Sequence, residues 1–204
     1  MPSSVLQAWQ MVSPLITTCL ALLTPLAGTL HAWAPRLYSH YKTKLSQLYK
    51  ATPNLQQTFH NSIWPAATFN LGPQTVTVQH RDIANLAFGW CSVTAFGEFD
   101  PKHSGHLILW DMKLVIEFPP GATILIPSAV LQHSNVALQE GDYRMSLTQY
   151  AAGGLFRWVE QGFQTSAQFK AADKKGKQCY DQESKNRWKK GLELFSTLSE
   201  LRQT

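Results

Sequence analysis

The chain has 204 residues, of which 44% are hydrophobic and only 15% are charged. Globular proteins usually carry about a quarter charged residues, so this composition excludes a disordered polyelectrolyte and predicts a substantial core. The formal net charge of +5 is concentrated at the ends, because residues 1–50 hold no acidic residue and residues 170–204 hold nine basic residues against five acidic ones. Basic ends suit a polyanionic partner, but they are also typical of a lysine surface that keeps a protein soluble.

The three cysteines are Cys19, Cys91 and Cys179, and they lie far apart with no CxxC pair. This spacing indicates neither a zinc site nor a disulfide framework. A reducing intracellular compartment is therefore predicted.

Residues 11–33 contain no charge and are long enough to span a bilayer. Pro14, Pro25 and Gly28 interrupt the stretch, and no lysine or arginine precedes Arg36 to form the basic start of a signal peptide. Buried helices of a soluble protein are favoured over a membrane or signal segment and over an organelle-targeting segment. We expect no membrane partner.

Residues 1–62 are predicted to form a flank of short helices that packs on the core. Leucine and alanine are common there, and prolines at positions 14, 25 and 35 divide the region. Within residues 36–50, four apolar side chains recur at spacings of three and four, which predicts a buried stripe on a helix. They are Leu37, Tyr41, Leu45 and Leu48.

Residues 63–165 are predicted to form a β core. Short runs rich in β-branched and aromatic residues alternate there with turn signals such as "GP", "DPKHSG", "PPG" and "EGD", a pattern typical of a sandwich or barrel. The predicted strand runs are "ATFNLG", "QTVTVQH", "WCSVTAFG", "GHLILWDMKLVIEF", "ATILIPSAV", "YRMSLTQYA" and "GLFRWVE".

Residues 166–204 are predicted to form a basic helical segment. One face of this segment is expected to carry Trp188, Leu192, Phe195 and Leu198. No internal repeat is present. The three regions together are predicted to make one domain.

Asp82 is the first acidic residue of the chain, two positions after His80. In an extended strand, residues i and i+2 point to the same face, so this imidazole and this carboxylate would enter one cavity. Two histidines and one carboxylate form the metal site of non-heme Fe(II) oxygenases. Among His103, His106 and His133, the last is favoured as third ligand because it follows a β run, whereas His103 lies in a polar turn. Alone, H-x-D is more typical of a solvated strand end.

Arg144 follows His133 by eleven residues, and Ser146 shares its face of the predicted strand. A guanidinium beside a hydroxyl can bind a carboxylate through charge-assisted hydrogen bonds. In Fe(II) oxygenases that use 2-oxoglutarate, this carboxylate is the distal end of the co-substrate. The alternative is a structural salt bridge from Arg144 to Asp142 or Glu140.

The segments "HRDIAN", "GHLILW" and "RMSLTQY", with His133 between the last two, resemble the TET/JBP family of nucleic-acid-base dioxygenases, in particular its short fungal, transposon-associated members. The resemblance covers residues 60 to 165. It implies an α+β protein whose core is a double-stranded β-helix, also called a jelly-roll or cupin-like core, between the helical ends. It also implies Fe(II), 2-oxoglutarate and O2 as cofactor and co-substrates.

The same resemblance implies that His80, Asp82 and His133 ligate iron and that Arg144 and Ser146 bind 2-oxoglutarate. It further implies roles for three other residues. His106 would contact the co-substrate near the iron, Asn85 would hydrogen-bond the target base, and Tyr150 would stack on that base. The alternatives are a polar residue at a strand edge for His106, a turn cap for Asn85 and core packing for Tyr150.

The resemblance implies oxidation of a methylated base in double-stranded DNA, chiefly of 5-methylcytosine to 5-hydroxymethylcytosine and further. A base must leave the duplex to reach a recessed metal. Basic residues near the C-terminus could contact phosphates: Lys174, Lys175, Lys177, Lys189 and Lys190. The alternatives are the same chemistry on 6-methyladenine, thymine, RNA or a small molecule, and a non-catalytic nucleic-acid-binding protein. We expect a monomer in the nucleus.

Overall fold

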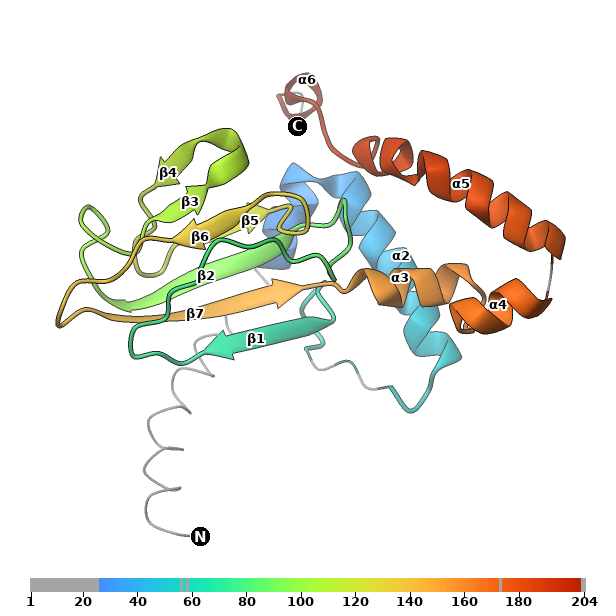
Figure 1. Ribbon diagram of the computed structural model, residues 1–204, viewed down its shortest axis with the longest axis horizontal. Coiled ribbons are helices and arrows are strands. Elements are labelled where there is room, and N and C mark those ends of the chain that lie inside the picture. Colours follow the sequence, from blue (N-terminus) through green and yellow to red (C-terminus); the bar gives the residue numbers. More distant parts are fainter. Residues whose placement is uncertain (1–25, 56, 58, 173, 203–204) are drawn as a thin grey trace, which may run out of the picture.

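The computed structural model describes residues 26–55, 57, 59–172 and 174–202 (Figure 1). Most of the uncharged stretch 11–33, with Cys19, lies outside these residues. Residues 26–33 are helical. The other helices are α2 (Pro35–Ala51), η1 (Trp110–Met112), α3 (Gly153–Glu160), α4 (Ser166–Ala172), α5 (Lys174–Leu192) and α6 (Leu198–Leu201). The strands are β1 (Ala66–Asn70), β2 (Cys91–Glu98), β3 (Leu107–Leu109), β4 (Leu114–Ile116), β5 (Thr123–Ile126), β6 (His133–Asn135) and β7 (Tyr143–Tyr150).

The strands form two antiparallel sheets, with the orders β1-β7-β2-β5 and β4-β3-β6. Apolar side chains from β2 and β5 in the larger sheet cluster with those of β3 in the smaller one, so a common core joins the two sheets. The predicted α+β class with a jelly-roll core is confirmed. The described strands all lie within residues 66–150, inside the range predicted for the core.

Helix α2 buries the predicted stripe. Leu37, Tyr41, Leu45 and Leu48 are its buried residues. They form a second core with residues of the β region and of α3, including Trp64 and Phe156. Figure 1 shows α2 and α3 together at one end of the strands. The helical flank therefore covers that end of the β core.

The run "GLFRWVE" is helix α3, so the strand prediction is wrong there. Its apolar residues recur at spacings of three and four, which fits a helix better than a strand. Phe156 is buried, and Leu155, Trp158 and Val159 pack against the same core as α2.

The run "QTVTVQH" is also not a strand of either sheet. It is extended but makes only isolated bridges, from Gln74 to Arg144 and from His80 to His133. Because β7 and β6 belong to different sheets, the segment crosses from one sheet to the other and cannot form a continuous ladder with either. We call residues 74–80 the crossing segment.

The C-terminal region is not one continuous amphipathic helix. Helix α5 ends at Leu192, and a new helix begins after Thr197, whose side chain forms a capping box with Glu200. The predicted apolar face is therefore broken, and Trp188, Leu192 and Leu198 are exposed. Arg36 ties this region to α2 through Glu193 O and Glu200, and it lowers the pKa of Glu200 to about 2.

Within the part of the chain that the structure describes, no helix has the length and apolar character needed to cross a bilayer.

We predict that Leu37→Ala destabilises the protein strongly, because Leu37 lies on the buried face of α2 and is fully buried. The expected loss in the free energy of unfolding is about 2–5 kcal/mol, measured by urea denaturation. Leu192→Ala is the matched control, because Leu192 is 55% exposed and its loss should stay within about 0.5 kcal/mol. Equal losses in both variants would contradict this packing.

Candidate metal centre and its cavity

The crossing segment brings His80 next to His133. Each residue donates its backbone N–H to the other's carbonyl oxygen, both at 3.0 Å. This reciprocal pair puts the two side chains on the same side, with ring centroids 4.3 Å apart. Two histidines 53 positions apart in sequence thus become neighbours.

Both imidazole rings are oriented by the backbone of their own segments. His80 Nδ1 lies 2.8 Å from Val78 O, and His133 Nδ1 lies 2.9 Å from Leu131 O. A carbonyl only accepts hydrogen bonds, so in the neutral form of each ring Nδ1 carries the proton and Nε2 keeps the lone pair that a metal ion would need. Metal-binding histidines are commonly oriented in this way.

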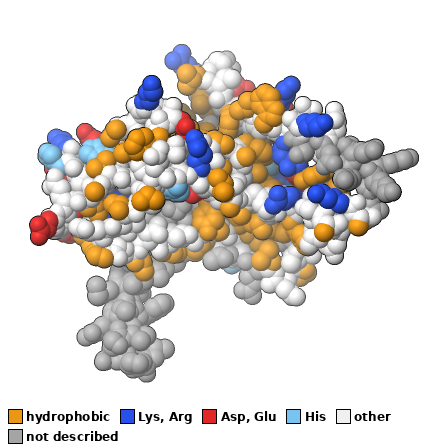
Figure 2. Space-filling model, viewed as in Figure 1, with side chains coloured by type: hydrophobic (Ala, Val, Ile, Leu, Met, Phe, Trp, Pro, Cys, Tyr) orange, Lys and Arg blue, Asp and Glu red, His pale blue; other side chains and the backbone are white. Residues whose placement is uncertain are grey.

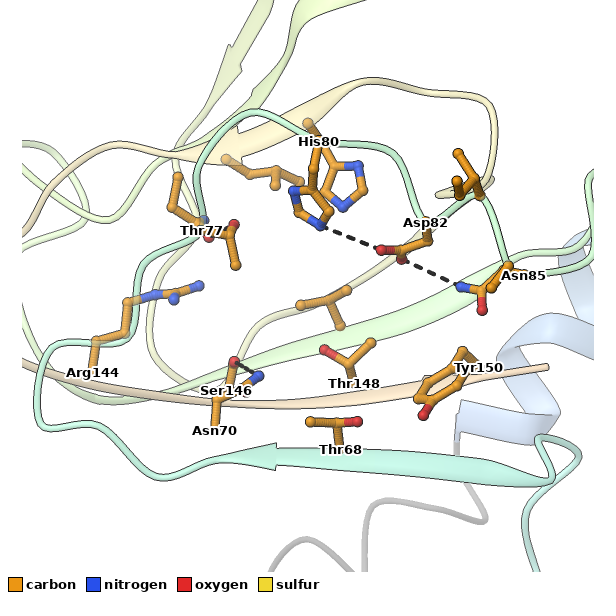
Figure 3. A pocket seen from close by; sticks show the side chains of 16 residues that line it. Thr68, Asn70, Thr77, His80, Asp82, Asn85, Arg144, Ser146, Thr148 and Tyr150 are labelled. Atoms are coloured by element: carbon orange, nitrogen blue, oxygen red, sulfur yellow. Dashed lines mark hydrogen bonds and ion pairs between the residues drawn. The ribbon is translucent and has the colours of Figure 1, made fainter. Parts of the chain in front are cut away.

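Asp82 supplies a carboxylate to the same place. Its Oδ1 lies 3.3 Å from His80 Nε2, and its backbone N–H donates to Ser128 O at 3.0 Å. Asn85 donates its side-chain amide to Asp82 Oδ2 at 3.3 Å and to Ser128 Oγ at 3.2 Å, as Figure 3 shows for Asp82. Asn85 therefore holds Oδ2 of the carboxylate, and Oδ1 faces His80.

The structure brings His80, Asp82 and His133 together as a cluster able to hold a metal ion. One ligand atom from each lies within 4.8 Å of the others. Two neutral imidazole nitrogens and one carboxylate oxygen suit a divalent transition metal such as Fe(II). The donor set and the orientation of both rings fit such an ion.

Strand β7 lines the cavity beside this cluster. Its alternate residues Arg144, Ser146, Thr148 and Tyr150 face the cavity (Figure 3), as the two-residue period of a strand requires. Ser146 Oγ accepts a hydrogen bond from Asn70 Nδ2 of β1 at 3.0 Å. The cavity has a volume of about 390 Å3, in the range of small-molecule sites.

Arg144 is a buried cation without an anionic partner. It is 1% exposed, and among the described residues no carboxylate forms an ion pair with it. Nη1 donates to Thr75 O at 2.6 Å, whereas Nε is buried with no partner. Burial lowers the pKa of Arg144. A buried, unpaired charge is unfavourable, so the site is suited to receive an anion.

The alternative salt bridges of Arg144 are not formed. Asp142 instead accepts hydrogen bonds from Ser104 Oγ at 2.6 Å and from Gln139 N at 2.9 Å. The rings of Phe99 and Phe118 flank the guanidinium, each centroid 6.0 Å from its central carbon. Strand β7 and these rings fix the direction of Arg144.

The three remaining predicted residues differ in whether they line the cavity. Asn85 and Tyr150 line the cavity, at the end away from Arg144 (Figure 3). His106 does not line it, whereas the next residue, Leu107, does. His106 Nδ1 is buried without a hydrogen-bond partner. The contact of His106 with the co-substrate stays a prediction.

Several polar residues of the site were not predicted from the sequence. They are Thr68, Asn70, Thr77, Ser128, Asn135 and Thr148. Thr77 Oγ1 donates to Asn135 Oδ1 at 2.9 Å, which joins the crossing segment to β6. Only the period-two pattern of β7 could have pointed to Thr148. The others depend on contacts between distant segments.

No family model and no curated protein matches the chain. The structure is similar in part to NgTET1, which was solved in complex with 5mC DNA. The two chains are 22% identical with a TM-score of 0.42, over 52% of this chain and 41% of the other. This chain thus corresponds to less than half of NgTET1.

Two further solved structures are similar to part of this chain. The collagen prolyl hydroxylase vCPH of Paramecium bursaria Chlorella virus-1, solved with 2OG, is 12% identical with a TM-score of 0.30, over 54% of this chain and 70% of its own. An RmlC-like cupin protein of Desulfovibrio desulfuricans is 15% identical with a TM-score of 0.29, over 41% of this chain and 69% of its own. None of these similarities is close enough to assign an activity.

We predict that the protein binds one divalent transition metal ion at this cluster. His133→Ala and Asp82→Ala each remove a ligand, and each should weaken Co2+ binding by about a hundredfold or more in titration calorimetry. His103→Ala is the matched control, because His103 lies on the surface and pairs with Asp100. Similar Co2+ affinities in all three variants would rule out the cluster as the metal site.

Proposed function

We propose that the protein is an Fe(II)- and 2-oxoglutarate-dependent dioxygenase that oxidises a methylated base in DNA, with 5-methylcytosine as the preferred substrate and 5-hydroxymethylcytosine as the first product. One observation carries the proposal. The His80–Asp82–His133 cluster and the buried, unpaired Arg144 line the same cavity. Such a cavity suits a dicarboxylic acid. One end of the acid would bind the metal ion, and its second carboxylate would pair with Arg144.

Fe(II) would be held by His80, Asp82 and His133, and with 2-oxoglutarate and O2 it would supply the oxidation, in which a methyl C–H becomes C–OH while the co-substrate becomes succinate and CO2. The protein itself binds and orients the co-substrate and the base, and it excludes water from the cavity. Arg144 would bind the distal carboxylate through charge-assisted hydrogen bonds, with Ser146 beside it. The co-substrate would then supply the anion that Arg144 lacks.

The other end of the cavity suits a flat, polar base. Tyr150 offers an aromatic face there, and Asn85 offers an amide. Both amide hydrogens of Asn85 point to Asp82 and Ser128, so its carbonyl oxygen is the atom left to meet the substrate. That oxygen can accept from the amino group of cytosine or adenine but not from O4 of thymine. The contact therefore suits an amino-bearing base such as methylated cytosine, and 6-methyladenine and thymine, the latter through its N3–H, are the alternatives.

Access of a base to this cavity requires that the base leave the duplex. Phosphate contacts would come from basic side chains. Figure 2 shows Lys and Arg side chains gathered at the helical end of the molecule, and Lys189 and Lys190 are exposed there. The side chains of Lys174, Lys175 and Lys177 lie outside those described. A DNA substrate would place the protein in the nucleus, and a monomer remains our expectation.

The proposed activity predicts coupled turnover. The protein loaded with Fe(II), incubated with 2-oxoglutarate, O2 and a 5-methylcytosine duplex, should form succinate and 5-hydroxymethylcytosine, both measured by mass spectrometry. Matched duplexes with 6-methyladenine or thymine should give much less product. Absence of every oxidised base and of succinate from folded, metal-loaded protein would disprove the proposal.

The proposed role of Arg144 predicts a specific loss of recognition. Saturating 2-oxoglutarate, at about a hundred times its Kd, should stabilise the metal-loaded protein by about 2.7 kcal/mol, seen as a rise in Tm. Pyruvate, which lacks the distal carboxylate, should stabilise it much less. Arg144→Gln should abolish this difference.

Arg157→Gln is the matched control, because Arg157 is exposed on helix α3 and does not line the cavity. It should keep the difference in Tm between 2-oxoglutarate and pyruvate. If Arg144→Gln distinguished 2-oxoglutarate from pyruvate as well as the unmodified protein does, another residue would bind the distal carboxylate.

A further inference from the structure

The loop that carries Asp82 makes a tight turn at the mouth of the cavity. Asn85 N donates to Asp82 O at 2.8 Å, so the four residues 82–85 form a β-turn with Ile83 and Ala84 at its corners. Asp82 and Asn85, at the two ends of the turn, both line the cavity. The corner residues therefore lie directly beside the metal cluster.

Ile83 is an unusual residue for this position. Turn corners favour Gly, Pro, Asn, Asp and Ser, whereas Ile83 is apolar and β-branched. Its side chain is 87% exposed, and that of Val78, on the other side of His80 in the sequence, is 84% exposed. These are the two most exposed large hydrophobic residues of the described chain. Ile83 adds almost nothing to the core, although it contributes to the lining of the cavity.

The turn that presents Ile83 is fixed at both ends. Before it, Arg81 donates to Val130 O and to Asp111 Oδ1, both at 2.8 Å. Within it, Ala84 O accepts from Gly153 N at 2.9 Å, and after it, Leu86 N donates to Ala151 O at 2.9 Å. A β-branched side chain also has few rotamers. Ile83 is thus a stiff apolar projection on a braced loop.

We infer that Ile83 is a wedge that enters the base stack of a duplex and takes the space of the base that moves into the cavity. This inference rests on the proposed function. Apolar wedges, isoleucine among them, separate stacked bases in many DNA-binding proteins. Ile83 would become buried only in the complex with DNA. Because Ile83 directly follows Asp82 in the chain, the wedge lies next to the metal cluster, where the base would enter the cavity. Ile83 is a positioning residue and takes no part in the oxidation.

The test compares substrates that need a wedge with substrates that do not. The metal-loaded full chain is given one 5-methylcytosine sequence as a paired duplex, as a duplex with an abasic site opposite the methylated base, and as a single strand. Ile83→Ala should lower kcat/KM on the paired duplex by about tenfold or more, since unstacking a paired base is unfavourable. On the other two substrates it should stay within about twofold, and Ile83→Met should restore activity on the paired duplex.

Val115→Ala is the matched control, because Val115 is 63% exposed on strand β4 and does not line the cavity. It should leave all three rates unchanged. A second readout is independent of oxidation. A duplex with 2-aminopurine at the target position, mixed with the protein under nitrogen, should become more fluorescent as that base unstacks, and Ile83→Ala should lose this rise.

The outcomes separate the wedge from the chemistry. If Ile83→Ala oxidises all three substrates in the same proportions as the unmodified protein, the wedge is disproved and the dioxygenase stands. If no substrate is oxidised but the fluorescence rise depends on Ile83, the proposed chemistry fails and the wedge stands. If there is neither oxidation nor a fluorescence rise, both proposals are overturned.

Discussion

The reciprocal backbone pair between His80 and His133 is the contact on which the site depends. It joins the crossing segment to β6 by two hydrogen bonds of 3.0 Å. Because the pairing is antiparallel, both imidazoles emerge on one side, and Asp82 follows two residues later. A shift of one residue in this pairing would turn one ring away. The geometry of the cluster thus follows from the register of this one residue pair. The crossing segment does not need a continuous strand ladder to bring the two histidines together.

The same segment also links the metal cluster to the anion site. At its start, Thr75 N donates to Arg144 O at 3.1 Å, and Thr75 O accepts from Arg144 Nη1 at 2.6 Å. At its end it provides His80. One short piece of chain therefore contacts the buried guanidinium at one end and contributes His80 to the proposed metal site at the other. Both features line one cavity, so the proposed co-substrate with two acidic ends would face both of them.

Local patterns in the sequence predicted what depends on local spacing. The α2 stripe and the shared face of Arg144 and Ser146 follow from helix and strand periods, and the structure has both. The crossing segment is predicted as a strand because its alternation is strand-like, yet its partners lie in two different sheets. The roles of Asn70 and Ser128 in the site come from their hydrogen bonds with residues far away in sequence. No local pattern in the sequence contains that information.

The turn 82–85 combines two requirements that usually conflict. A metal ligand must be rigid, and here backbone and side-chain hydrogen bonds fix Asp82 and Asn85. A side chain that separates the stacked bases of a duplex must be apolar and exposed in the free protein, and exposed apolar area does not stabilise the fold. Ile83 can be exposed without loosening Asp82 because the contacts of Arg81 and Ala84 hold the turn independently of its side chain. Separating the support of the loop from its exposed tip would let a single turn serve both the proposed metal site and the proposed DNA partner.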